Sequence, residues 1–333
     1  MGAAEFARHV SITDQSDLID YGRQVIATEA AALTVLGASL STSFAQAIAT
    51  IMNLRGRVVA TGIGKSGHIA RKFAATLSST GTPALFVHPA EAAHGDLGML
   101  AAGDGLVAFS NSGSTAELQP VLAHATKLGL PIIGIASRAD SLVMHHASVR
   151  LLLPRLDEAC PANLAPTTST SMMMALGDAL AMTVMRARGV SRSGFEALHP
   201  GGTIGKKLMR VAALMHRSDA LPLVGLDEAM RDVIVTMTTR SFGIAGVVDD
   251  AGALVGVITD GDLRRHLHGL FDSIARDVMT PDPVWVSPGC FVEDALNILN
   301  QHKITAMFTV EDAVRRRPVG LVHVHDFLRL GLA

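Results

Sequence analysis

Residues 61–67 read TGIGKSG and directly follow the apolar run RVVA, so a glycine-rich turn with one lysine ends a predicted strand. A triphosphate-binding loop would need a glycine where the chain has Val59. A dinucleotide-binding loop has the spacing of Gly62, Gly64 and Gly67, but it also needs a carboxylate about 20 residues later to hold a ribose. The next predicted strand ends in VHP and offers no carboxylate. Both familiar nucleotide loops are therefore disfavoured.

The chemistry that remains in this loop is generic anion binding. Glycines let backbone N–H groups approach a ligand, the N-terminus of the following helix favours an anion, and Lys65 adds a positive charge. A second loop, SNSGSTAEL at residues 110–118, offers hydroxyl groups at the start of another predicted helix. Hydroxyls and amides with a single lysine favour one phosphate monoester, and the alternative is that both loops are ordinary turns. The residues nominated for this phosphate are Gly64, Ser66, Ser112, Ser114 and Thr115.

The segments that must position these loops alternate in type between residues 57 and 185. Short apolar runs are separated by helical patterns such as HIARKFAATLSS. This alternation predicts βαβ crossovers and a parallel sheet with helices on both faces. Because ligands bind beyond the carboxyl ends of such strands, we expect TGIGKSG, FVHPAEAAHGD and SNSGSTAE to converge. The predicted strands are residues 57–62, 83–88, 105–110, 130–136 and 149–154.

A stretch without charge occupies residues 30–54. Polar residues such as Ser39, Gln46 and Asn53 make it too polar for a membrane span of about 20 apolar residues. Large apolar residues recur at three- and four-residue steps, which predicts one amphipathic helix or two consecutive ones. We expect a core helix of a soluble protein.

The second half of the chain contains a repeat. Met215 and Asp262 are followed, each 64 residues later, by Met279 and Asp326, and a Val-Gly pair recurs at the same offset. Two copies of one α/β unit are the simplest interpretation, and two are too few for a solenoid. We therefore expect the copies to pair face to face.

Composition sets the remaining bounds. The chain has 333 residues, enough for two or three domains with real cores, and its net charge of -2 disfavours nucleic acid or acidic lipid as a partner. Cys160 and Cys290 form neither a disulfide framework nor a zinc cluster. The first residues lack a basic segment followed by an apolar one, which predicts no signal peptide. We expect a cytoplasmic protein with no nucleic-acid and no membrane partner.

The run from TGIGKSG to SNSGSTAEL resembles a sugar isomerase (SIS) domain. It is similar to the arabinose-5-phosphate isomerases, which interconvert D-ribulose 5-phosphate and D-arabinose 5-phosphate on the way to the lipopolysaccharide sugar Kdo. The segments DEACPANLAPTTSTSMMMALGDALA and FEALHPGGTIGKKL continue the resemblance, and the repeat resembles a pair of CBS domains. The fold that the resemblance implies is α/β: a SIS domain with a doubly wound, flavodoxin-like parallel sheet, then a tandem CBS pair. The expected parts are an N-terminal helical segment (1–38), the SIS domain (39–186), a connector that carries an active-site histidine (187–211) and two CBS domains (212–271 and 275–333).

The resemblance implies a set of catalytic residues. In this family a lysine, two glutamates and a histidine are regarded as catalytically relevant, and here they fall on Lys65, Glu117, Glu158 and His199. Each also has a simpler interpretation. Glu117 could stabilise a helix dipole, Glu158 could be solvated, and His199 could shape a turn before Pro-Gly-Gly.

Substrate contacts in the family fall on His94 and on the Gly81–Thr82 turn. His88 falls on a zinc site at which the metal tends to inhibit, although a hydrogen-bonding histidine is the more ordinary reading. Ser114 stands where relatives often have Glu, which leaves the detail of the phosphate loop open. No cofactor is expected to be required.

Aldose–ketose interconversion moves a proton between C1 and C2 through an enediolate and needs no redox cofactor. It requires a base, donors for the developing oxyanion and a grip on the distal phosphate. A base works best with a pKa near the working pH, which favours His199 or a partly desolvated Glu158. We hypothesise that one of these two moves the proton while Lys65 and His94 polarise oxygens.

For the repeat, the resemblance implies an adenine nucleotide bound through Thr259 and Asp262. The second copy has His323 where the hydroxyl should be, so at most one good ribose site is expected. The alternatives are a CMP-sugar as ligand, or a dimerising module that binds nothing. The resemblance also implies a homotetramer whose active sites lie between subunits.

Three functions stay open at this point. The favoured one is an arabinose-5-phosphate isomerase; the others are an isomerase of another sugar phosphate and a sensor that binds a sugar phosphate without turnover. The joint presence of Lys65, Glu117, Glu158 and His199 favours an enzyme, because a sensor needs no acid–base set.

Overall fold

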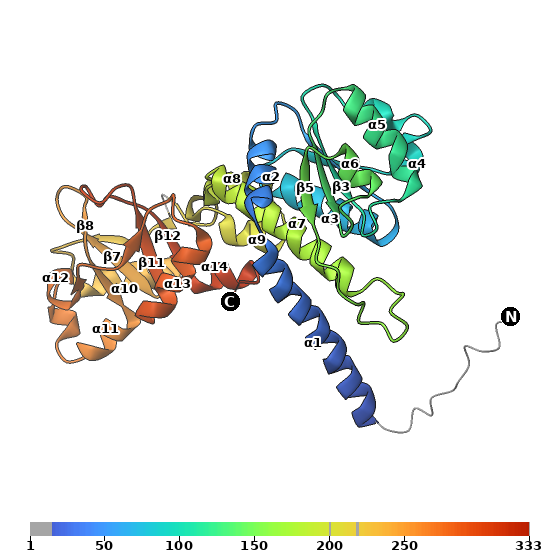
Figure 1. Ribbon diagram of the computed structural model, residues 1–333. Coiled ribbons are helices and arrows are strands. Elements are labelled where there is room, and N and C mark those ends of the chain that lie inside the picture. Colours follow the sequence, from blue (N-terminus) through green and yellow to red (C-terminus); the bar gives the residue numbers. More distant parts are fainter. Residues whose placement is uncertain (1–14, 200, 218–219, 333) are drawn as a thin grey trace. The chain divides into compact units, whose positions relative to one another are not determined.

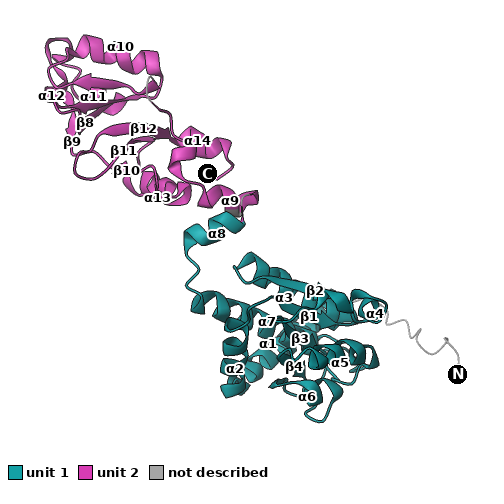
Figure 2. Ribbon diagram, turned by 90° about the horizontal axis from the view of Figure 1, so that it is seen from above, with its two compact units in different colours: residues 1–198 teal, residues 199–333 magenta. Residues whose placement is uncertain are grey.

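The computed structural model describes residues 15–199, 201–217 and 220–332. The first 14 residues of the predicted N-terminal segment therefore lie outside the described residues. The chain divides into two compact units, residues 1–198 and 199–333, and each is considered by itself (Figure 2). The predicted connector spans this division.

The first unit is built on a parallel five-stranded sheet with the order β2-β1-β3-β4-β5, of which Figure 2 labels the first four strands. This is the flavodoxin-like order, so the predicted fold is confirmed. All five predicted strands form. β1, β3 and β4 are almost wholly apolar and are buried on both faces, with Thr61 of β1 as the one polar residue. The strands are β1 (Val58–Gly62), β2 (Ala84–Val87), β3 (Gly105–Phe109), β4 (Ile132–Ala136) and β5 (Val149–Leu152).

Helices cover both faces of this sheet, because alternate strand residues point to opposite sides. Val58 and Val107 pack in one core with α2, α3 and α7, whereas Val59 and Leu106 pack in a second core with α5 and α6. The helices of the unit are α1 (Gln15–Ser39), α2 (Thr42–Met52), α3 (Gly64–Ser79), α4 (Pro89–Ala92), α5 (Gln119–Lys127), α6 (Leu142–His146), α7 (Thr168–Ala187) and α8 (Arg192–Leu198), with 3₁₀ turns η1 (Asp96–Met99) and η2 (Ala116–Leu118).

The uncharged stretch folds as two consecutive helices. No described helix is by itself long and apolar enough to cross a membrane; α1 and α2 pass that test only as a pair, and they are bent by 79°. The expected core packing of residues 30–54 is confirmed in both helices, because Ala32 and Leu36 near the end of α1 belong to the same core cluster as Ala47 and Ile51 of α2. In α1 only Ala32 and Leu36 are buried, and the helix extends from the unit in Figure 1.

The second unit contains the predicted repeat. Helices α10 (Met230–Arg240) and α13 (Val292–His302) correspond, as do strands β7 (Ile244–Val248) and β11 (Ala306–Val310), and β8 (Leu254–Thr259) and β12 (Pro318–His323). The turn of the second copy is longer, at 311–317 against 249–253. The other elements are α9 (Gly202–Leu208), η3 (Val211–Ala213), β6 (Leu223–Gly225), α11 (Asp260–Arg265), η5 (Leu270–Asp272), α12 (Ala275–Val278), β9 (Thr280–Pro281), β10 (Trp285–Val286) and α14 (Val324–Arg329).

The two copies pack face to face, as the sequence predicts. One core cluster joins Ile244 and Leu254 of the first copy with Phe308 and Leu321 of the second. A Cβ on Gly246 would lie only 2.7 Å from the Phe308 ring. The interface between copies is therefore part of the core of this unit.

Candidate functional site

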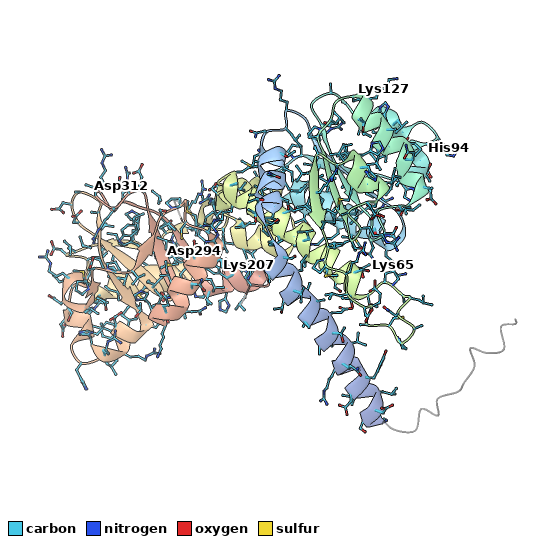
Figure 3. The ribbon with its side chains drawn as sticks, viewed as in Figure 1. Lys65, His94, Lys127, Lys207, Asp294 and Asp312 are labelled. Atoms are coloured by element: carbon cyan, nitrogen blue, oxygen red, sulfur yellow. The ribbon has the colours of Figure 1, made fainter. Side chains whose placement is uncertain are left out.

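The two predicted phosphate loops meet at the point where the sheet reverses direction. The chain leaves β1 to form β2 on one side and returns to form β3 on the other side of β1. The loops that follow β1 and β3 therefore flank the topological switch point, where flavodoxin-like sheets bind ligands. In Figure 3, Lys65 lies toward the end of the unit at which the loop between β5 and α7 emerges.

Close backbone packing shapes the loop after β1. Gly67 packs on the carbonyl oxygen of Gly62, and Gly64 adopts a positive φ of 58°. The N-cap of α3 is Ile63, which provides no side-chain hydrogen bond, and no acidic residue occupies the first turn. The helix N-terminus is therefore available to an anion, with exposed Lys65 in its first turn.

The loop after β3 has an internal scaffold and an exposed rim. Ser110 is buried; its Oγ accepts the N–H of Gly113 at 3.0 Å and lies 3.1 Å from Oγ1 of Thr115. Ser112 and Ser114 are exposed. The hydroxyl of Thr115 is thus engaged within the loop. Oγ of Ser112 also accepts the N–H of Ser114 at 3.3 Å, but both serines are exposed and can still donate their hydroxyls to a ligand.

Glu158 is held by the start of α7. Its Oε2 accepts the N–H of Thr167 at 2.7 Å and the N–H of Ser169 at 3.1 Å, and the Ser169 hydroxyl donates to Oε1. Burial raises the pKa of this carboxyl, but the hydrogen bonds from Ser169 and Thr167 outweigh burial and hold the pKa below its ordinary value. The expectation of a solvated glutamate, or of one with a pKa near neutrality, is therefore wrong.

The Gly81–Thr82 turn lies at the other edge of the sheet. It precedes β2, and Ala84 pairs with Val58 at the start of β1, whereas Lys65 follows the end of β1. The five residues of β1 place these edges about 16 Å apart. Thr82 is buried and its hydroxyl accepts a 2.9 Å hydrogen bond from Nε of Arg188. Within one chain, the structure does not bring this turn to the phosphate loops.

Three other nominated residues also follow the carboxyl ends of strands. His88 comes directly after β2 and caps α4, since its Nδ1 accepts the N–H of Ala90 at 3.3 Å. His94 and Glu117 are exposed. In the described part of the chain, no group of three His, Cys, Asp or Glu residues is arranged to hold a metal ion. The residues present do not fit a complete zinc site at His88.

His199 begins the second unit, beyond the end of α8. It has an interaction partner. Lys65 is in the first unit and His199 is in the second, and each unit is considered by itself. The catalytic role of His199 therefore stays a prediction.

The second unit contains a cleft of about 830 Å³ between the two copies. Thr259, Lys303 and His323 are among its lining residues. Asp262 is buried instead; its carboxylate accepts hydrogen bonds from the N–H and hydroxyl of Thr259 at 2.8 and 2.6 Å. Of the two nominated ligand residues, only Thr259 lines this cleft.

Two corresponding contacts in this unit were not foreseen. Oγ1 of Thr280 donates to the carboxylate of Asp262 at 3.0 Å. The equivalent positions in the repeat are His216 and Asp326, and there Nε2 of His216 lies 3.1 Å from the carboxylate of Asp326. Burial lowers the pKa of His323, and neighbouring His325 lowers it further. Sequence reasoning also missed Thr167, Ser169 and Arg188. The only available signal was the polar run TTSTS at the start of a predicted helix.

Comparison with known proteins agrees with this architecture. Residues 51–183 match the SIS domain family, and residues 211–269 and 275–333 match the CBS domain family. Arabinose 5-phosphate isomerase KdsD of Escherichia coli K12 is 40% identical over 329 residues, which cover 97% of this chain and 99% of that protein. The protein of the same name from Pseudomonas aeruginosa PAO1 is 40% identical over 327 residues, with 97% and 100% covered.

A solved structure shares the first unit. The c3406 protein of E. coli CFT073, solved in complex with arabinose 5-phosphate, is 37% identical, with a TM-score of 0.55. The match covers 56% of this chain and 100% of that chain.

Proposed function

This chain belongs to the arabinose 5-phosphate isomerase family, in which a SIS domain precedes a CBS pair, and we propose that the loops after β1 and β3 hold the phosphate of its pentose substrate. The enzyme is an aldose–ketose isomerase that interconverts D-ribulose 5-phosphate and D-arabinose 5-phosphate. We place the reaction in the biosynthesis of Kdo and in the cytoplasm, as the resemblance implies.

One observation carries the phosphate proposal. Two loops of suitable chemistry, with the α3 N-terminus, Lys65, Ser112 and Ser114, flank the same switch point. Backbone amides and hydroxyls can donate to phosphate oxygens, and the helix dipole and lysine compensate the charge. The other end of a phosphorylated pentose then lies among the remaining residues of this sheet edge.

The lowered pKa of Glu158 bears on the choice of base. An enediolate forms when a base removes a proton from one carbon, and that proton returns to the neighbouring carbon. A carboxylate that already accepts four hydrogen bonds is a weak base. We therefore favour His199 for the proton transfer, with Lys65 opposite the developing oxyanion and Glu117 as an exposed carboxylate nearby.

A second copy supplies the Gly81–Thr82 turn in our proposal. Both residues lie at the sheet edge opposite Lys65, so one chain cannot present the turn and the phosphate loops to one pentose phosphate. The exposed apolar side chains of α1, including Ile19 and Ile26, support burial against another subunit. We propose a homotetramer in which the Gly81–Thr82 turn of one subunit meets the phosphate loops of another.

For the CBS pair we propose a regulatory nucleotide or CMP-sugar in the 830 Å³ cleft. Thr259 can bond a ribose hydroxyl, and Lys303 provides a positive charge. Titration with AMP, ATP and CMP-Kdo in a calorimeter tests this; the absence of heat with all three would favour a purely structural pair.

The experiment that decides the main function is incubation of the full chain with D-ribulose 5-phosphate, followed by identification of the aldopentose. D-arabinose 5-phosphate is the expected product. A different aldose phosphate would indicate an isomerase of another substrate, whereas binding without turnover would indicate a sensor. A zinc titration of the same reaction tests whether metal at His88 inhibits.

A further inference from the structure

The start of α7 binds the half-buried carboxylate of Glu158 through four hydrogen bonds. Oε2 accepts three hydrogen bonds, from the N–H and hydroxyl of Thr167 at 2.7 and 3.1 Å and from the N–H of Ser169 at 3.1 Å. Oε1 accepts one, from the Ser169 hydroxyl. A carboxylate offers about four lone-pair positions, two on each oxygen. The protein therefore saturates Oε2 and leaves capacity on Oε1 alone.

The loop that carries Glu158 is also fixed on its other side. Oδ1 of Asn163 accepts the N–H of Glu158 at 2.6 Å, and Oγ1 of Thr167 accepts the N–H of Ala159 at 2.8 Å. The Ser169 side chain belongs to a residue that is only 3% exposed, so water does not compete readily for its hydroxyl. Hydrogen bonds at Glu158 and at Thr167, the two ends of the 158–167 loop, thus hold Glu158 in one orientation.

The bonds also select the charge state of Glu158. Its Oε atoms face N–H and O–H donors from the start of α7, and these donors stabilise the anion. The carboxylate also lies at the N-terminus of a 20-residue helix, where the dipole favours negative charge. If Glu158 were protonated, one of its oxygens would carry a hydrogen, and one of these donors would lose its acceptor.

We propose that Thr167 and Ser169 are positioning residues of the isomerase site, which fix Glu158 as an anion and leave only Oε1 to accept a hydrogen bond from a bound sugar hydroxyl. The proposal rests on the isomerase function stated above. It makes Glu158 a fixed acceptor that orients substrate, and it assigns the proton transfer to another group.

The test compares Ser169→Ala with a matched control, Ser171→Ala. Ser171 is on the same helix, but its hydroxyl donates to Glu29 at 2.8 Å and does not touch Glu158. In Ser169→Ala we expect kcat to fall about tenfold, which is about 1.4 kcal/mol of lost transition-state stabilisation, with KM within about twofold. The acid limb of the kcat profile should move to higher pH. Ser171→Ala should stay near the parent.

A second readout does not depend on turnover. The infrared carboxyl band of Glu158, identified by its loss in Glu158→Gln, reports the protonation midpoint of this group in the folded chain. We expect the midpoint in Ser169→Ala to lie above that of the parent. If the parent shows no isomerisation, the proposed function fails while this titration still tests the anion.

These two readouts distinguish a positioning serine from a structural one. A lower kcat together with a raised midpoint supports the positioning role. An unchanged midpoint overturns it, even if kcat and thermal stability fall together, because that pattern describes a structural serine. A raised midpoint with unchanged kcat also overturns it, since Glu158 would then play no part in orienting the substrate.

Discussion

A Cβ atom on Gly67, in the first turn of α3, would lie 2.6 Å from the carbonyl oxygen of Gly62 at the end of β1. The end of the strand and the start of the helix are therefore too close to admit a side chain at Gly67, and the phosphate loop between them depends on this approach. We expect Gly67→Ala to destabilise the first unit by about 1 to 3 kcal/mol and to raise KM, because the loop must move. Denaturant unfolding and substrate titration measure both effects.

The control is Gly22→Ala in α1, where an added Cβ meets nothing within 4 Å. Alanine in a helix interior should stabilise by about 0.5 to 1 kcal/mol and leave KM unchanged. If the Gly67→Ala protein had the KM of the parent, the proposed role of this loop in binding the substrate phosphate would be contradicted.

Lys65 should matter through its charge. We expect Lys65→Met to lower kcat/KM at least about 100-fold, since the developing oxyanion or the phosphate would lose its cation. Lys127→Met is the matched control. Lys127 is also exposed, but it lies at the end of α5 and away from Lys65 (Figure 3). Similar losses in both variants would show that the effect is general electrostatics.

The stability of the first unit should depend on Asp104 in a pH-dependent manner. This buried carboxylate accepts the N–H of Arg57 at 2.7 Å and of Ala101 at 3.0 Å. Burial raises the pKa of Asp104, but these bonds and the Arg57 side chain lower it further than burial raises it. Because the folded pKa lies below the unfolded one, the stabilisation is present above about pH 4 and is lost as pH falls through the folded pKa.

Asp104→Asn should therefore cost about 1 to 3 kcal/mol at pH 7. The difference from the parent should begin to shrink below about pH 4, where the carboxyl of the unfolded parent takes up a proton, and should vanish as pH falls through the lower folded pKa. Unfolding curves between pH 3 and pH 7 give the measurement, with the exposed Asp140→Asn as control. A difference that stays constant across this range would mean that shape, and not charge, makes Asp104 important.

The repeat predicts a reciprocal packing test. Met215, near the start of the first copy, packs on Gly320 of the second, and Met279, near the start of the second, packs on Gly256 of the first. Gly320→Ala should overlap Met215 and destabilise the second unit by about 1 to 3 kcal/mol. Gly225→Ala, with open space around the site of the added methyl group, should have little effect. If Gly320→Ala and Gly225→Ala unfolded at the same denaturant midpoint, the packing of Met215 on Gly320 would not matter for the stability of this unit.

The exposed face of α1 predicts a change in assembly. Ile19 and Ile26 are 56% and 71% exposed within the chain. We expect the double change of both to Glu to lower the molar mass measured by light scattering, because two charges would enter an apolar contact. Gln24→Glu on the same helix is the control. An unchanged mass would exclude α1 from the subunit contact.

Much of the fold was determined by the sequence alone. The strands β1, β3 and β4 are almost wholly apolar, and such runs predict strands that are buried on both faces. The loops at Lys65 and Ser112 follow from their glycines, hydroxyls and position after strands. The repeat was visible because Met215 and Met279 begin copies at one constant offset. Each of these signals is local or periodic, so neighbouring residues carry it.

Only the tertiary structure decided where distant groups meet. Gly81 and Thr82 lie at the sheet edge opposite Lys65 because the intervening helix returns the chain to the start of the next strand. Glu158 has a low pKa because residues nine and eleven positions later close around its oxygens. No local pattern encodes such pairings, since hydrogen bonds and burial depend on which segments the sheet order brings together.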